Sequence, residues 1–62
     1  MKPQKIEEKD LMKTYNDFRH YGDFVHREDY EQLGMTKISF KYQEKTAVFV
    51  MERGKVIRGY YV

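Results

Sequence analysis

Imidazole and carboxylate side chains recur at every third position of one short stretch, as His20, Asp23, His26 and Asp29. Both groups are common metal ligands, and an imidazole beside a carboxylate can also act as a general acid or base. Gly22 is expected to end a helix between the two histidines, so this spacing does not place the four side chains on a shared face. We therefore predict neither a metal site nor a catalytic site from them.

The sequence has no other set of residues that is typical of catalysis. It contains no cysteine, its one serine is Ser39, and it has no glycine-rich phosphate-binding loop. We therefore expect a protein that is not an enzyme and that uses no cofactor.

The formal charge changes sign along the chain. Residues 1–34 hold six Lys or Arg against eight Asp or Glu, whereas residues 35–62 hold six against two. A basic half points mildly to an acidic partner such as nucleic acid. Exposed strands also favour lysine because it blocks edge-to-edge aggregation, so the charge alone does not choose between these interpretations.

The length limits what this chain can do by itself. Its 62 residues make one domain, and a domain of that size buries only about 60% of its unfolded surface. Such scaffolds usually need disulfides, a metal or a partner chain, and without cysteine a homo-oligomer or a protein partner becomes plausible. No apolar run approaches the roughly 20 residues of a membrane span, and residues 1–10 are polar, so we expect a cytoplasmic protein without a membrane segment.

The first half of the chain predicts two helices. Leu11, Tyr15 and Phe18 recur at helical spacing and predict a helix over residues 6–20, preceded by a frayed tail over residues 1–5. A second, shorter helix is expected over residues 27–33. Gly34 would terminate it in the left-handed conformation.

The second half predicts three strands. Residues 36–42 alternate apolar and polar side chains, residues 46–52 are apolar on both faces, and residues 55–62 form the last strand. The expected fold is α+β: an N-terminal helix and a short second helix, then a three-stranded antiparallel β-meander with the first helix packed on one sheet face.

The last turn decides which side chains share a face. A two-residue loop, Arg53-Gly54, would require a positive φ at Arg53, whereas a three-residue loop from Glu52 requires it only at Gly54. We prefer the three-residue loop. It predicts a core face formed by Ile38, Phe40, Tyr42, Ala47, Phe49, Met51, Ile57 and Tyr61.

The opposite side of the sheet, here called the second face, is the main functional candidate. The preferred loop places on it Lys37, Ser39, Lys41, Val48, Val50, Val56, Arg58 and Tyr60. A protein interface there would use Val48, Val50, Val56 and Tyr60, with the cations as its polar rim. A nucleic-acid site would use Lys37, Lys41, Arg58 and Tyr60, with cations on phosphates and the ring on a base. A third possibility is that another part of the chain covers the valines.

The sequence therefore predicts a small non-enzymatic protein-interaction or regulatory module that self-associates as a homodimer through the second face. The alternative is a nucleic-acid-binding module that uses the cations of the same face. In its size and its lack of cysteine and catalytic motifs, the chain resembles in type the short accessory proteins of bacteria and phages.

Overall fold

The computed structural model describes residues 4–62. One α-helix lies against a five-stranded antiparallel sheet with the strand order β1-β5-β4-β3-β2. In chain order the elements are β1 (Gln4–Lys5), α1 (Glu8–Tyr21), β2 (Asp23–Tyr30), the 3-10 turn η1 (Glu31–Leu33), β3 (Met35–Tyr42), β4 (Lys45–Glu52) and β5 (Lys55–Tyr61). The expected fold, with two helices and a three-stranded meander, is therefore wrong.

The prediction of the first helix is confirmed, with slightly shifted ends. α1 buries Leu11, Tyr15 and Phe18, the stripe that the spacing indicated. Acidic residues occupy its first turn and basic residues its last, which suits the helix dipole. The rings of Tyr15 and Phe18 meet Phe49 of β4 edge-on, with centroid distances of 5.2 and 5.8 Å.

The second helix does not form. Asp23–Tyr30 is an edge strand that pairs with β3 along its length, and every one of its eight residues is exposed. The charged side chains of this segment would lie in solvent on a helix and on an edge strand alike, so they do not distinguish the two. On an edge strand they also prevent pairing with another chain. Only Glu31–Leu33 turns as a 3-10 helix, and Gly34 ends it in the predicted left-handed conformation, with φ 65°.

The N-terminal segment adds a further strand. Gln4 and Lys5 pair with Tyr61 and Tyr60, and the Ile6 amide donates to the Gly59 carbonyl at 2.9 Å. The expected frayed tail over residues 1–5 is thus wrong for these two residues, and residues 1–3 lie outside the described part of the chain.

The last hairpin uses the two-residue loop, so the preferred register is wrong. Glu52 pairs with Lys55, and Arg53 adopts the positive φ of 52° that had counted against this loop. A bulge then adds one residue, Ile57, to β5. As a result Val56 lies opposite Met51 on the core face, whereas Ile57 is 43% exposed.

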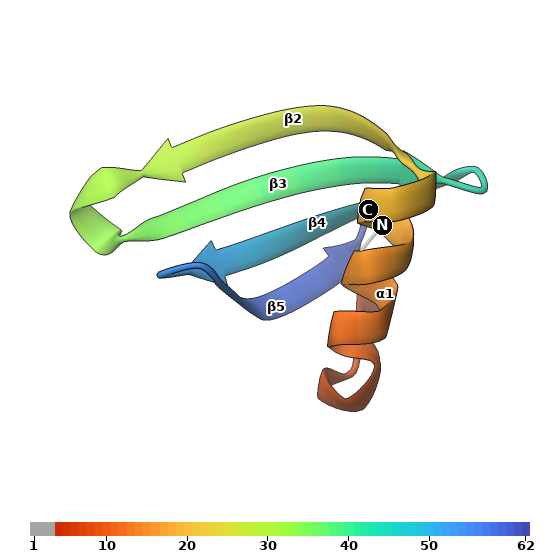
Figure 1. Ribbon diagram of the computed structural model, residues 1–62, viewed down its shortest axis with the longest axis horizontal. Helices are drawn as coiled ribbons and strands as arrows, with labels where there is room; N and C mark the ends of the chain where they lie inside the picture. Colours follow the sequence, from red (N-terminus) through yellow and green to blue (C-terminus); the bar gives the residue numbers. More distant parts are fainter. Residues whose placement is uncertain (1–3) are drawn as a thin grey trace.

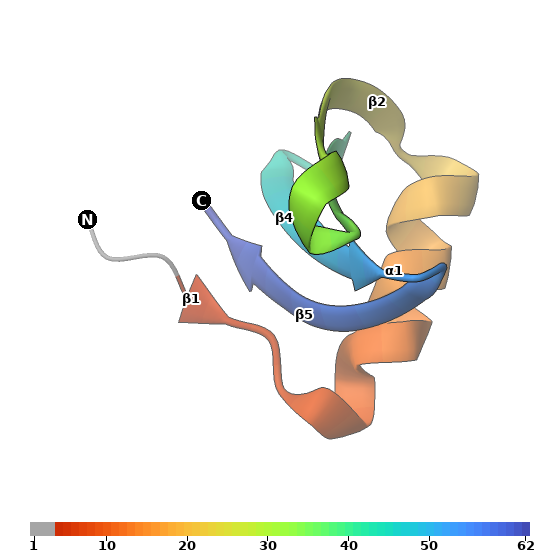
Figure 2. The same cartoon turned by 90° about the vertical axis from the view of Figure 1, so that its left-hand side faces the viewer.

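The core lies between α1 and the middle of the sheet. It consists of Ile6, Leu11, Tyr15, Phe18, Ala47 and Phe49, with Phe40, Tyr42, Met51, Val56 and Tyr61 packed against it. Ile38, another predicted member of the core face, pairs with Phe49 and also points to the helix side, whereas Ile57 does not. Seen along its length, the sheet bends so that β2 and β5 curve toward the side of α1 (Figure 2). No helix within residues 4–62 is long and apolar enough to cross a membrane.

Candidate binding surfaces

α1 covers only one end of the sheet. It crosses the strands near the start of β2, and the other end of the sheet, with η1 and the β4–β5 turn, extends beyond it (Figure 1). A helix is about 10 Å wide, whereas an eight-residue strand is about 26 Å long. One helix therefore leaves a large part of the helix-side face uncovered.

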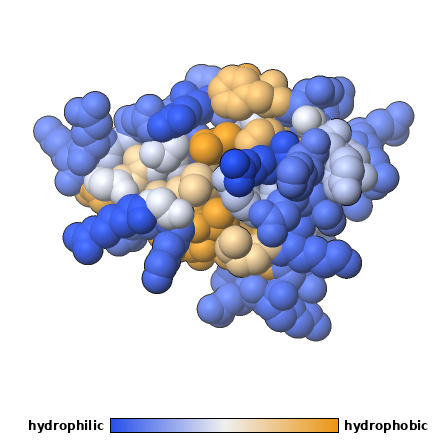
Figure 3. Space-filling model, in the orientation of Figure 1, coloured by the Kyte–Doolittle hydropathy of each residue, from blue (hydrophilic) through white to orange (hydrophobic). Residues whose placement is uncertain are grey.

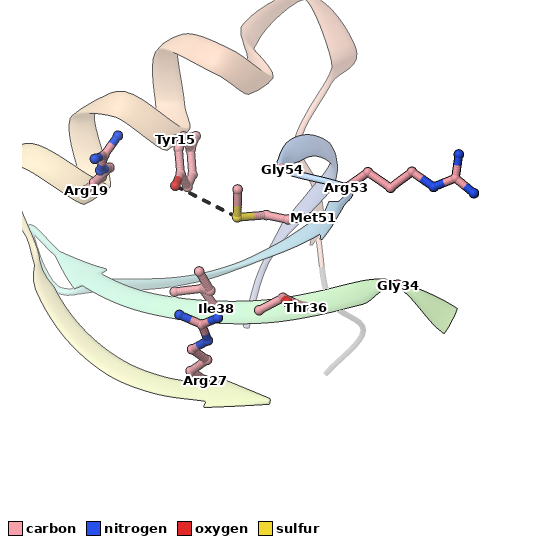
Figure 4. Close-up of a pocket in the computed structure, with 9 residues that line it drawn as sticks. All are labelled: Tyr15, Arg19, Arg27, Gly34, Thr36, Ile38, Met51, Arg53 and Gly54. Carbon is pink, nitrogen blue, oxygen red and sulfur yellow. Dashed lines mark hydrogen bonds between the residues drawn. The ribbon is translucent and has the colours of Figure 1, made fainter. Parts of the chain in front are cut away.

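A hollow of about 570 Å³ occupies this uncovered part (Figure 4). Its lining residues come from α1, from the strands β2, β3 and β4 and from two turns: Tyr15, Arg19, Arg27, Gly34, Thr36, Ile38, Met51, Arg53 and Gly54. The Tyr15 hydroxyl donates to the Met51 sulfur at 3.9 Å and so ties the helix to the floor. Ile38 and Met51 are only partly buried there, because no second helix lies above them.

A second hollow of about 380 Å³ continues the first along the helix. It shares Tyr15, Arg19, Met51 and Gly54 with the first and adds Met12, Asn16, Lys55 and Val56. We call the two together the helix-side groove. Its floor is apolar, formed by Met12, Tyr15, Ile38, Met51 and Val56.

The space-filling view shows the same arrangement. On the side of the molecule that carries α1, apolar atoms gather in the middle and hydrophilic side chains surround them (Figure 3). Met12 contributes to this surface from the helix and is 55% exposed. Apolar surface that remains open within a charged border is typical of a site that another molecule covers.

The charge around the groove is positive. Among the residues that line it, all within 4–62, four are cations and none carries a carboxylate; the cations are Arg19, Arg27, Arg53 and Lys55. Asp29 lies beside this border and accepts from Arg27 at 3.2 Å and from Thr36 at 2.9 Å. The Thr36 hydroxyl, with a smaller effect of Arg27, holds the pKa of Asp29 below its ordinary value.

The second face keeps most of its predicted residues. Cross-strand pairing places Lys37, Val50 and Arg58 in one row, and Ser39, Val48 and Tyr60 in the next. Lys41 follows along β3 on the same face. Val56 is the exception, because the hairpin register turns it to the helix side.

The apolar centre of the second face is smaller than predicted. Val50 is 4% exposed within the single chain, so its neighbours already exclude water from it. Val48 and Tyr60 are partly exposed. Of the four predicted interface residues, therefore, only these two remain available to a partner on this face.

β2 changes the electrostatics of the second face. It places Glu28 opposite Lys37 and Asp23 opposite Lys41, so two of the three predicted phosphate-binding cations face a carboxylate. β2 also adds an aromatic ring, because Tyr30 lies under the Lys37 ammonium at 5.8 Å from the ring centre.

Tyr30 and Glu28 also influence one another's titration. The Tyr30 hydroxyl donates to Glu28 and holds the pKa of that carboxyl below its ordinary value, and His26 contributes in the same direction. The same hydrogen bond raises the pKa of Tyr30. Both groups are therefore stabilised in their common states at neutral pH.

The histidines and carboxylates with three-residue spacing are not brought together as a site. His26 contacts Glu28 at 3.2 Å on the exposed edge strand, whereas His20 lies in the last turn of α1. Across the described part of the chain, no three His, Cys, Asp or Glu side chains are grouped so as to hold a metal ion.

Sequence reasoning missed the helix-side groove. Arg19 falls near the end of the predicted first helix and Arg27 at the start of the predicted second helix, and neither position indicates a site. One signal was present: three strands of seven or eight residues with only one amphipathic helix long enough to cover them. When the helices are too few to cover a sheet, part of a sheet face is expected to stay open, although the sequence does not show which part.

No family model, no curated protein and no solved structure matches this chain.

Proposed function

We propose that this chain is a non-enzymatic protein-interaction module that binds a segment of a partner protein in the helix-side groove. The observation that carries the proposal is the apolar floor that α1 leaves uncovered beside the core. Covering such a floor is favourable by roughly 25 cal/mol for each Å² of apolar surface removed from water. A partner would supply the layer that the chain itself lacks.

The groove suits a peptide segment better than a small molecule. It is an open trough between a helix and a sheet, and such troughs accept amphipathic segments whose apolar side chains lie along the floor. Two methionines, Met12 and Met51, form part of this floor. Their flexible side chains adapt to partner shape, as on other peptide-binding surfaces.

Self-association through the second face receives less support. Val50 has little surface left to bury, and Val56 lies on the other side of the sheet. A homodimer would therefore use the groove rather than the valines. A dimer mass in solution that Met12→Asp reduces to the monomer mass would identify that case.

Selection of displayed random peptides on the immobilised protein tests the proposal. We expect enriched peptides whose affinity falls at least about tenfold, or about 1.4 kcal/mol, on Met12→Asp. The matched control is Val62→Asp, which adds the same charge at a residue that is 69% exposed and outside the groove. Peptides that bind both variants equally well, or no enrichment at all, would contradict the proposal.

A nucleic-acid-binding module is the second candidate function. The specific observation in its favour is Tyr30, which gives the face that carries Lys37, Lys41 and Arg58 a second ring in addition to Tyr60. The test is titration with a single-stranded oligonucleotide at several salt concentrations, because released counterions make such affinity fall steeply with salt. Affinity that is unchanged in Lys41→Glu with Arg58→Glu would exclude this function.

A further inference from the structure

We propose that the segment bound in the helix-side groove is acidic as well as apolar: an amphipathic stretch with large apolar side chains on one side and Asp or Glu along its borders. This inference rests on the proposed function and adds the chemistry of the partner to it.

The border of the groove is the first argument. Its four cations meet no carboxylate among the lining residues that the structure describes. Asp29 offsets Arg27 from beside the groove, but the salt bridges found within residues 4–62 include neither Arg19 nor Arg53. A basic partner would meet like charges here, whereas an acidic partner would neutralise them.

The positions of the cations are the second argument. Arg19 comes from α1 and Arg27 from β2, so they lie on opposite sides of the floor with Ile38 and Met51 between them (Figure 4). Arg53 lies at the far end, on the β4–β5 turn, and its side chain extends away from the floor. A segment lying along the floor would have carboxylates within reach of guanidinium groups on both of its sides. Guanidinium binds carboxylate with two parallel hydrogen bonds, so this arrangement selects acidic side chains specifically.

The floor argues against a purely ionic ligand. A phosphate or a nucleic-acid backbone would satisfy the arginines, but it would leave Met12, Ile38, Met51 and Val56 uncovered. Only a ligand that carries both apolar and acidic groups uses the whole groove. A protein segment is the common molecule of that kind.

Fluorescence anisotropy with two labelled synthetic peptides tests the inference. One peptide carries leucines at helical spacing bordered by glutamates, and its matched partner has lysine at every glutamate. We expect the glutamate peptide to bind at least about tenfold more tightly than the lysine peptide. We also expect the preference to be lost in Arg19→Glu with Arg27→Glu, and retained in Lys41→Glu with Arg58→Glu, which changes the charge equally on the second face.

Arg19→Glu alone provides a second test if the double variant does not fold, because Arg19 is exposed on the helix surface. This variant should bind the glutamate peptide less tightly, while its circular dichroism spectrum stays unchanged.

The outcomes separate this inference from the proposed function. If both peptides bind equally and Met12→Asp weakens both, the groove binds protein segments and only the acidic preference is wrong. If neither peptide binds and peptide selection also fails, both proposals are wrong. If a single-stranded oligonucleotide displaces the glutamate peptide, the groove binds nucleic acid and this inference is overturned. If the free protein is a dimer that Met12→Asp dissociates, the groove binds a second copy of the chain, and this inference is overturned as well.

Discussion

Gly22 connects α1 to β2, and we predict that Gly22→Ala is strongly destabilising for a reason of space alone. Its φ of −92° and ψ of −178° are extended backbone that any residue adopts. A Cβ built at Gly22, however, would lie 2.6 Å from the carbonyl oxygens of both Phe18 and Lys41, and 3.0 Å from the Cβ of Tyr42. These are backbone atoms of α1 and β3 together with a rigid Cβ, so no side-chain rotation removes the clash.

The magnitude follows from comparison with other crowded positions. Overpacking in cores costs roughly 1–3 kcal/mol when side chains can adjust. At Gly22 the helix must move away from β3 instead, so we expect about 3 kcal/mol or more. A chain of 62 residues at roughly 0.05–0.15 kcal/mol per residue has a total stability of about 3–9 kcal/mol. The substitution therefore removes a third or more of the stability of the protein.

Urea unfolding followed by circular dichroism measures the effect. With a slope of about 1 kcal/mol per molar urea, the midpoint should fall by about 3 M, or the variant should be unfolded in buffer. Gly34→Ala is the control, because Gly34 has φ 65° but nothing within 4 Å of an added Cβ, so only backbone strain of about 1 kcal/mol is expected. A midpoint for Gly22→Ala at or above that of Gly34→Ala would refute the reasoning.

Three further predictions concern the sheet. Tyr30→Phe removes the hydrogen bond to Glu28, so the pKa of Glu28 should rise toward its ordinary value of 4.5 in an NMR titration. Because the pKa of Glu28 in the folded protein lies below that value, its contribution to stability exists above about pH 4.5 and is lost as the pH falls through the folded pKa. In Tyr30→Phe, the stability that Glu28 contributes should decrease less as the pH falls. An unchanged pKa of Glu28 would show that the Tyr30 hydrogen bond does not lower it. Val56→Ala should lower the free energy of unfolding by about 1–2 kcal/mol and Ile57→Ala by less than about 1 kcal/mol, because only Val56 packs on the core. The reverse order in urea unfolding would support the three-residue loop instead. Glu44→Gly should raise the free energy of unfolding by up to about 1 kcal/mol, because Glu44 has φ 64° in a two-residue turn, and a lower urea midpoint would contradict this.

The sequence predicts those elements whose side-chain pattern has one dominant period. The helical stripe of Leu11, Tyr15 and Phe18 and the alternation of β3 identify elements that the structure confirms. β2 lacks such a pattern because both of its faces and its outer edge meet solvent, so nothing requires apolar residues at every second position. β1 is too short for any pattern, since two residues show no period.

The register and the groove were beyond sequence reasoning for different reasons. The positive φ at Arg53 costs too little to exclude the two-residue loop. No residue type announces the bulge at Ile57, which returns Arg58, Tyr60 and Tyr61 to their predicted faces but with different partners on β4. The groove depends on where α1 crosses the sheet. That position is determined by the short connection at Gly22 and by Gly59, where a Cβ would lie 2.9 Å from Leu11.

The two edges of the sheet differ in how easily they open, because β1 at one edge has only two residues. A pair this short opens locally at low free-energy cost. Its opening joins the backbone of Tyr60 and Tyr61 to the rest of the outer edge of β5, which β1 does not pair and which carries the exposed side chain of Ile57. The opposite edge, β2, is long but carries charged side chains along its length, which resist pairing with another chain. We therefore expect fibril growth in this protein, where it occurs, to start at β5. Amides of β5 that face β1 should accordingly exchange with deuterium faster than those of β4, and equal protection of the two strands would argue against a weak edge.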